Sequence, residues 1–163
     1  MANTRLNERP WTWTPSPTMN RMMATLLRLP LLHRLISKMI LLITFTGRKS
    51  NQHYTIPVGY FREGLTITIL TKRFRKWWHN FEEPTDVEVR IEGRNYAGQA
   101  AALTDIQTII PIVARVMEVH PREAQIYAVK LLDNGIPDMD SIRELAPKIV
   151  VIQVNLMSSK GTV

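Results

Sequence analysis

The chain has 163 residues and a mass of 18.8 kDa, with 45% hydrophobic and 21% charged residues. This suits one globular domain and excludes a disordered, collagenous or coiled-coil protein. Cysteine is absent, which excludes disulfides, cysteine-based zinc or iron–sulfur sites and a thiol nucleophile. The formal charge is +7, and residues 1–50 hold eight Lys or Arg against one acid, whereas the rest holds thirteen of each sign. Such a basic third can meet nucleic acid, an anionic membrane surface or a phosphorylated small molecule.

The first 38 residues are expected to form an arm and amphipathic helices that pack on the domain. Trp11 and Trp13 stand among prolines, as is typical of an extended arm. Apolar residues then recur at helical spacing on both sides of Pro30. No apolar run reaches the roughly 18–20 residues of a membrane span, and no secretory cleavage pattern follows. We therefore expect a cytoplasmic protein, with peripheral contact of residues 11–38 with an anionic membrane as the alternative.

From residue 39 the pattern favours strands. The apolar run 40–45 predicts a strand that ends at the polar turn 46–51. Residues 53–62 predict the returning strand, and Pro57 confines it to a sheet edge or a bulge, because proline donates no ladder hydrogen bond. Residues 65–71 alternate between apolar and polar and give the clearest strand.

The second half of the chain mixes helices and strands. We expect a short helix within residues 72–81, a hairpin of strands 87–91 and 95–103, a helix over 106–119 capped by Thr104 or Asp105, a shorter helix over 122–132, and a buried last strand over 148–156. Five or six mostly antiparallel strands of this length favour closure, because closure removes exposed edges. The predicted fold is therefore an α+β barrel.

The familiar catalytic motifs are missing. The four histidines, at positions 33, 53, 79 and 120, lie far apart and have no carboxylates at ligand spacing, so no metal site is expected. The serine hydrolase, dinucleotide-binding and P-loop motifs are also missing from the sequence. A nucleotide-like ligand would have to be held in another way.

Two basic clusters are the best candidates for a binding site. Residues 46–50 combine Arg48 and Lys49 with hydroxyls and a glycine, which suits phosphate or carboxylate oxygens, although a solvated turn has the same composition. Residues 72–76 hold four cations directly before Trp77 and Trp78. This suits an anionic aromatic ligand, and single-stranded nucleic acid ranks below it. One of the two indoles is expected to belong to the core.

The order of these motifs is similar to that of a known family. The residues that carry the similarity are Gly47-Arg48-Lys49-Ser50, Ile56-Pro57-Val58-Gly59-Tyr60, Trp77-Trp78-His79-Asn80-Phe81 and the turn Glu92-Gly93-Arg94. Over roughly residues 40–154 the chain resembles the deazaflavin (coenzyme F-420)-dependent nitroreductase family, in the flavin-binding split-barrel superfamily related to pyridoxamine phosphate oxidases. The resemblance implies a small, six-stranded, mostly antiparallel split β-barrel over residues 39–157, with residues 1–38 and the other helices packed outside.

The resemblance also implies a redox enzyme. Its cofactor would be coenzyme F-420, with FMN as the alternative, and its partner a small lipophilic acceptor such as a quinone or a nitro compound. The implied cofactor-binding residues are Arg48, Lys49 and Ser50 at the acidic tail, Tyr54, Pro57, Val58 and Gly59 along the cofactor, Leu70, Thr71 and Lys72 at the ring, and Trp77, Trp78 and Asn80 closing the pocket. No catalytic side chain is implied, because the cofactor carries the hydride chemistry. The alternative is a non-catalytic binder of an amphipathic ligand or of anionic membrane on the same barrel, and a homodimer stays open.

Overall fold

The alternating residues form a seven-stranded antiparallel sheet in the computed structural model, which describes residues 39–157. The predicted arm and helices of residues 1–38, and with them the predicted membrane contact, lie outside the described residues. The strand order is β2-β1-β5-β6-β7-β4-β3. The strands are β1 Ile40–Thr46, β2 His53–Gly59, β3 Phe61–Glu63, β4 Thr66–Lys72, β5 Thr85–Ile91, β6 Arg94–Leu103 and β7 Ile149–Leu156.

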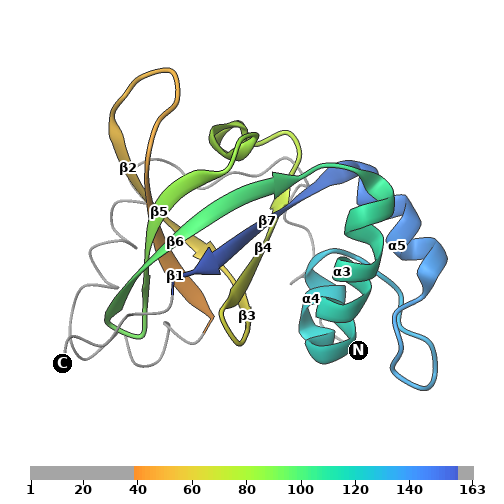
Figure 1. The fold of residues 1–163 in the computed structure, drawn as a ribbon. Coiled ribbons are helices and arrows are strands. Elements are labelled where there is room, and N and C mark those ends of the chain that lie inside the picture. The colour runs from red at the N-terminus through yellow and green to blue at the C-terminus, as the bar shows by residue number, and fades with distance from the viewer. Residues whose placement is uncertain (1–38, 158–163) are drawn as a thin grey trace, which may run out of the picture.

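The sheet curls into a partial barrel, which confirms the α+β barrel prediction (Figure 1). Its two outer strands, β2 and β3, are separated in the chain by Tyr60 alone. Because one residue joins the two edges, the sheet must bend until those edges approach each other. The single strand predicted over 53–62 is therefore wrong: β2 pairs with β1 and β3 pairs with β4, so the described chain has seven strands rather than six. Pro57 does lie in an edge strand, opposite Leu42.

The concave side of the sheet holds the first of two cores. Alternate residues of β1, β4, β5 and β7 point inward, and two aromatic side chains from the 3₁₀ turn η2 (Trp77–Phe81) complete the packing: Trp78 and Phe81. The helix predicted within residues 72–81 is thus a single short turn. Trp78 is 7% exposed and its indole Nε1 donates to the carbonyl of Arg73 at 3.0 Å. It is the core indole that the sequence predicts.

Helices cover the convex side. They are α3 Ile106–Val119, α4 Pro121–Ile126 and α5 Met139–Leu145, followed by the 3₁₀ turn η3 Ala146–Lys148, and Figure 1 shows the three α-helices together at one end of the sheet. Their buried residues form the second core with Leu70 and Val151 of the sheet. Asp105 is the N-cap of α3, with its carboxylate accepting from the Thr108 N–H at 2.8 Å. Within residues 39–157, none of the helices has the length and apolar character to cross a bilayer.

The helical region after α3 differs from prediction. The helix predicted over 122–132 ends at Ile126, and Ala128 adopts a left-handed φ of 56°, which a helix cannot continue through. The unpredicted helix α5 begins after Asp138, whose carboxylate accepts from the Ser141 N–H at 3.2 Å. Seven residues are too few for the helical period to show in the sequence.

Replacing Trp78 tests the inner core. We expect Trp78→Ala to lower the free energy of unfolding by about 3–5 kcal/mol, because it removes a buried indole and leaves a cavity. The change is measured by urea denaturation followed by circular dichroism. Phe74→Ala is the matched control, because Phe74 is 41% exposed, and it should cost far less. Equal losses for the two variants would show that the indole is not part of the core, and Trp78→Phe provides a milder variant if the alanine protein does not fold.

Candidate functional site

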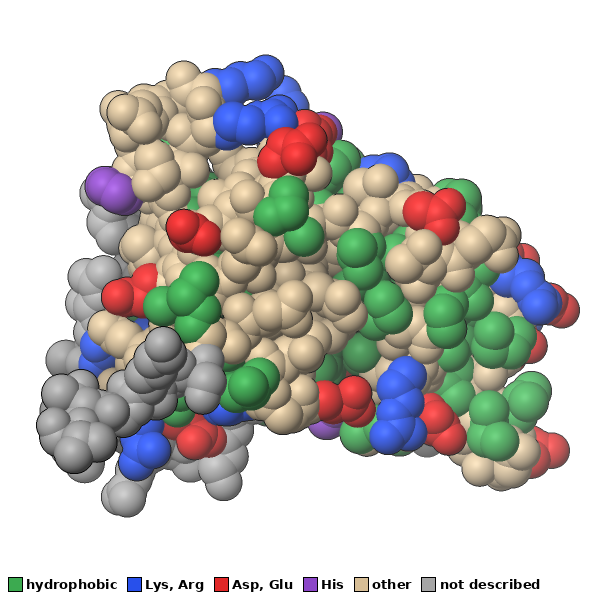
Figure 2. Space-filling view, in the orientation of Figure 1, with side chains coloured by type: hydrophobic (Ala, Val, Ile, Leu, Met, Phe, Trp, Pro, Cys, Tyr) green, Lys and Arg blue, Asp and Glu red, His purple; other side chains and the backbone are tan. Residues whose placement is uncertain are grey.

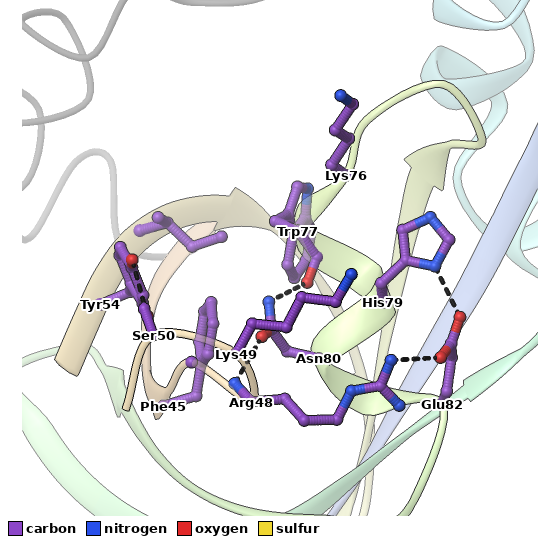
Figure 3. A pocket seen from close by; sticks show the side chains of 12 residues that line it. Phe45, Arg48, Lys49, Ser50, Tyr54, Lys76, Trp77, His79, Asn80 and Glu82 are labelled. Carbon is purple, nitrogen blue, oxygen red and sulfur yellow. Dashed lines mark hydrogen bonds and ion pairs between the residues drawn. The ribbon is translucent and has the colours of Figure 1, made fainter. Parts of the chain in front are cut away.

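A cavity of about 680 Å³ opens between the β1–β2 turn and η2. Figure 3 shows the two ends of this cavity, which differ in chemistry. One end is basic, with Arg48 and Lys49, and the other is aromatic, with Phe45 and Tyr54. Trp77 lies between the two ends, and Lys76 stands beyond Trp77, apart from Arg48 (Figure 3). The structure thus brings Lys76 and Trp77, at the end of the second cluster, to the same cavity as the first cluster, whereas the other cations of the second cluster lie outside it.

The β1–β2 turn is built around Gly47. Its N–H donates to the Gln52 carbonyl and its carbonyl accepts from the Asn51 N–H, each at 2.8 Å. A Cβ at position 47 would lie 2.6 Å from both the Ser50 Oγ and a ring carbon of Tyr54, so only glycine lets the turn pack on the tyrosine. The Ser50 and Tyr54 hydroxyls are 3.0 Å apart. The turn therefore presents its cations from a fixed position.

Asn80 joins this turn to η2. Its side-chain oxygen accepts from the Arg48 backbone N–H at 2.9 Å, and its side-chain nitrogen donates to the Trp77 carbonyl at 2.8 Å. One amide thus satisfies polar backbone groups from two segments that are remote in sequence. This link holds the turn against η2 beside the cavity (Figure 3).

The basic end contains one carboxylate. Glu82 accepts from the Arg48 Nη2 at 2.7 Å through one oxygen and from the His79 Nδ1 at 2.6 Å through the other. These hydrogen bonds, first that from His79 and then that from Arg48, hold the pKa of the Glu82 carboxyl below its usual value. Lys49 and Lys76 have no ion-pair partner among the described residues. In Figure 2, Lys and Arg side chains gather over the tip of the β1–β2 turn, with acidic and His side chains beside them.

The aromatic end rests on the inner core. The ring centroid of Phe45 lies 5.8 Å from that of Tyr54, 6.5 Å from that of Trp77 and 4.9 Å from that of the buried Phe81. Trp77 also meets Phe81 edge to face, with centroids 5.8 Å apart. Because the rings pack on one another and on the core, this wall is positioned without a ligand.

The predicted site residues fall into three groups. Six line this cavity: Arg48, Lys49, Ser50, Tyr54, Trp77 and Asn80. Two line a second cavity of about 540 Å³ beside α4: Gly59 and Leu70. Five line neither cavity: Pro57, Val58, Thr71, Lys72 and Trp78. The cofactor-binding roles of all thirteen stay predictions.

The five residues that line neither cavity are buried or half-buried in the fold. Thr71 and Trp78 are buried, and Pro57 and Val58 lie half-buried in the edge strand β2. Burial and the neighbouring Arg75 guanidinium lower the pKa of the Lys72 ammonium. Since side chains alternate between the faces of a strand, a run of consecutive strand residues cannot all face one cavity.

Sequence reasoning missed Phe45, His79 and Glu82 as site residues, although all three line the cavity. Lys76, a member of the second basic cluster that the sequence singles out, lines it as well. Phe45 ends the apolar run directly before the predicted basic turn, so its position could have suggested it. His79 and Glu82 stand three residues apart, and a helical turn over this segment would have placed the two side chains on one side. The residues that the structure describes contain no cluster of three His, Cys, Asp or Glu suited to a metal ion.

The second cavity has an apolar wall and a few polar groups. Phe61, Leu70 and Val119 line it together with Glu123 and Tyr127. The Tyr127 hydroxyl donates to the Leu70 carbonyl at 3.2 Å, and burial raises the pKa of this phenol. Burial also raises the pKa of the Glu123 carboxyl.

Several solved structures are similar to this chain, whereas no curated protein matches it. A candidate pyridoxamine 5'-phosphate oxidase from Listeria innocua is 12% identical, with 77% of this chain and 91% of that chain covered and a TM-score of 0.49. An F420-H2 dependent reductase is 20% identical, with 71% and 92% covered and a TM-score of 0.46. The heme storage protein HutZ from Vibrio cholerae is 9% identical, with 78% and 89% covered and a TM-score of 0.49.

A family model gives the most specific match. Residues 22–131 match the model described as F420H(2)-dependent quinone reductase. The match covers more than half of the chain and includes both basic clusters, which confirms the deazaflavin-dependent family that the motifs predict. It points to an oxidoreductase and to coenzyme F-420 as the cofactor. The chain therefore belongs to the F420H(2)-dependent quinone reductase family.

Proposed function

We propose that the cavity between the β1–β2 turn and η2 binds reduced coenzyme F-420, and that the chain passes hydride from it to a quinone or a similar lipophilic acceptor. The observation that carries the proposal is the division of the cavity into a basic and an aromatic end. A deazaflavin is a flat ring with an anionic tail, so its two parts require these two environments. Family membership supplies the cofactor class and the acceptor class.

The aromatic end fits the ring. Trp77 is partly buried against the inner core, and the Phe45 ring lies between it and Tyr54, in contact with both. Flat apolar faces that are already in place favour binding, because little side-chain freedom is lost when the ring arrives. The volume of about 680 Å³ lies within the usual range of roughly 300–1,000 Å³ for small-molecule sites.

The basic end fits the tail. Lys49 and Lys76 line the cavity and have no ion-pair partner among the described residues, so each can donate charge-assisted hydrogen bonds to phosphate or carboxylate oxygens. The Ser50 hydroxyl adds a neutral donor from the same turn. The Asn80 bonds hold this turn against η2, so the distance between tail and ring contacts is set before binding.

The protein's part in the reaction is to bind the cofactor and the acceptor and to orient them toward each other. When bound, reduced coenzyme F-420 would supply a hydride and a proton, and these two together convert a quinone into a hydroquinone. The acceptor would have to lie against the cofactor ring in the same cavity, because hydride passes only between atoms that are in contact.

A turnover assay separates this proposal from the non-catalytic alternative, which relies on residues 1–38. We expect the purified chain to oxidise reduced coenzyme F-420 in the presence of a soluble quinone, followed by the absorbance of the cofactor, and to bind FMN more weakly than coenzyme F-420. Binding without oxidation for quinones and for nitro compounds would favour the non-catalytic binder. Absence of binding for both cofactors would contradict the proposal.

Charge removal at the turn tests the tail site. We expect Arg48→Ala with Lys49→Ala to weaken coenzyme F-420 binding by at least tenfold, because charge-assisted contacts are worth about 1.5–3 kcal/mol each. Unfolding free energy should change by no more than about 0.5 kcal/mol. The matched control is Arg94→Ala with Lys130→Ala, which removes the same charge from exposed positions outside the cavity. Equal affinities for the two double mutants would place the tail elsewhere.

Replacing Trp77 tests the ring site. We expect Trp77→Ala to lower both affinity and melting temperature, because this indole lines the cavity and packs on the core. Trp77→Phe should recover most of the stability and part of the affinity. Isothermal titration and thermal melting on the two variants give both quantities. A melting temperature that falls while the affinity stays unchanged would limit Trp77 to a structural role.

A further inference from the structure

Glu82 places a negative charge in the part of the cavity that the proposed function assigns to an anionic tail. The carboxylate lines the cavity, and one of its oxygens accepts from the Arg48 guanidinium at 2.7 Å. This is the contact that a carboxylate or phosphate of a ligand would make with Arg48. One cation of the turn is therefore already bound to an internal anion.

The pair is accessible and exchangeable. The side chains of Arg48 and Glu82 are 46% and 38% exposed. Ion pairs at this exposure are weak, because water and salt screen them. Only the Nη2 of the guanidinium contacts Glu82, so a ligand can approach Arg48 while the pair is still formed.

Glu82 has a second anchor that does not depend on Arg48. Its other oxygen accepts from the His79 Nδ1 at 2.6 Å, and the His79 ring stacks on the buried Trp78 indole with centroids 3.7 Å apart. Figure 3 shows the His79 and Arg48 side chains meeting Glu82 from two sides. When Arg48 binds a ligand instead, the Glu82 carboxylate stays in place and can form the ion pair with the guanidinium again.

We propose that Glu82 competes with the acidic tail of coenzyme F-420 for Arg48 and thereby shortens the time the cofactor stays bound. This inference rests on the proposed function of the cavity. Each turnover consumes one reduced cofactor, so the oxidised form has to leave before the next reduced molecule binds. A cavity with three cations and no internal anion would hold a polyanionic tail more tightly and release it more slowly. Glu82 is thus a positioning residue that regulates cofactor exchange and does not touch the reacting atoms.

The test compares glutamate variants in two backgrounds. Glu82→Gln keeps the shape of the side chain and removes its charge, whereas Glu83→Gln removes the same charge from the adjacent exposed glutamate, which does not line the cavity. Dissociation constants and dissociation rates for coenzyme F-420 are measured by fluorescence titration and stopped flow. We expect Glu82→Gln to bind about two- to fivefold more tightly, mainly through slower dissociation, as suits the loss of an exposed ion pair. Glu83→Gln should match the wild type.

The Arg48→Ala background shows whether the effect passes through the guanidinium. There Glu82→Gln should change the affinity much less than in the wild type, because no Arg48 guanidinium is present for Glu82 and the cofactor tail to compete for. Unchanged or weaker binding by Glu82→Gln in the wild-type background would overturn the inference, as would equal tightening by Glu83→Gln, which would indicate a general charge effect. If the wild type binds no coenzyme F-420, the proposed function itself fails and the inference fails with it. Binding by the wild type without the Glu82→Gln effect overturns the inference alone.

Discussion

The arrangement of the site depends on the side-chain amide of Asn80. It accepts from the Arg48 backbone and donates to the Trp77 carbonyl, and so it holds a hairpin turn against a 3₁₀ turn that follows more than twenty-five residues later. The bond to the Trp77 carbonyl is partly buried, so breaking it would leave polar groups with reduced access to water. Asn80 thus holds the turn that carries Arg48 and Lys49 against η2, which carries Trp77.

The curl of the sheet brings the β1–β2 turn and η2 close enough for Asn80 to bond both. The outermost strands are consecutive in the chain and joined through Tyr60, so the sheet bends, and the β1–β2 turn lies against η2. The interior in turn holds Trp78 and Phe81, which fix η2 from below. Asn80 lies between these two buried residues in the sequence, and its side chain reaches the β1–β2 turn.

The sequence predicts the strands well and the site only in part. Alternation identifies β4, a continuous apolar run identifies β7, and Pro57 correctly indicates an edge strand, because these features act within a few residues. The break at Tyr60 does not show in the sequence, because it depends on β2 pairing with one edge of the sheet and β3 with the other. The helix α5 does not show either, because seven residues are too few to display the helical repeat of apolar residues. The same distinction applies to the site: the basic clusters are local and visible, whereas the pairing of Glu82 with Arg48 spans thirty-four residues and needs the curled sheet.

A ¹⁵N-resolved NMR titration of the full chain with coenzyme F-420 tests most directly whether the cofactor binds between the β1–β2 turn and η2. We expect chemical-shift changes at the backbone amides of Gly47 to Ser50 and of five residues in and beside η2, because these residues line the cavity: Lys76, Trp77, His79, Asn80 and Glu82. Amides of Asp133 to Gly135, which lie in a loop outside both cavities, serve as the internal reference and should not shift. Changes confined to the residues around α4, or no changes at all, would contradict binding between the turn and η2.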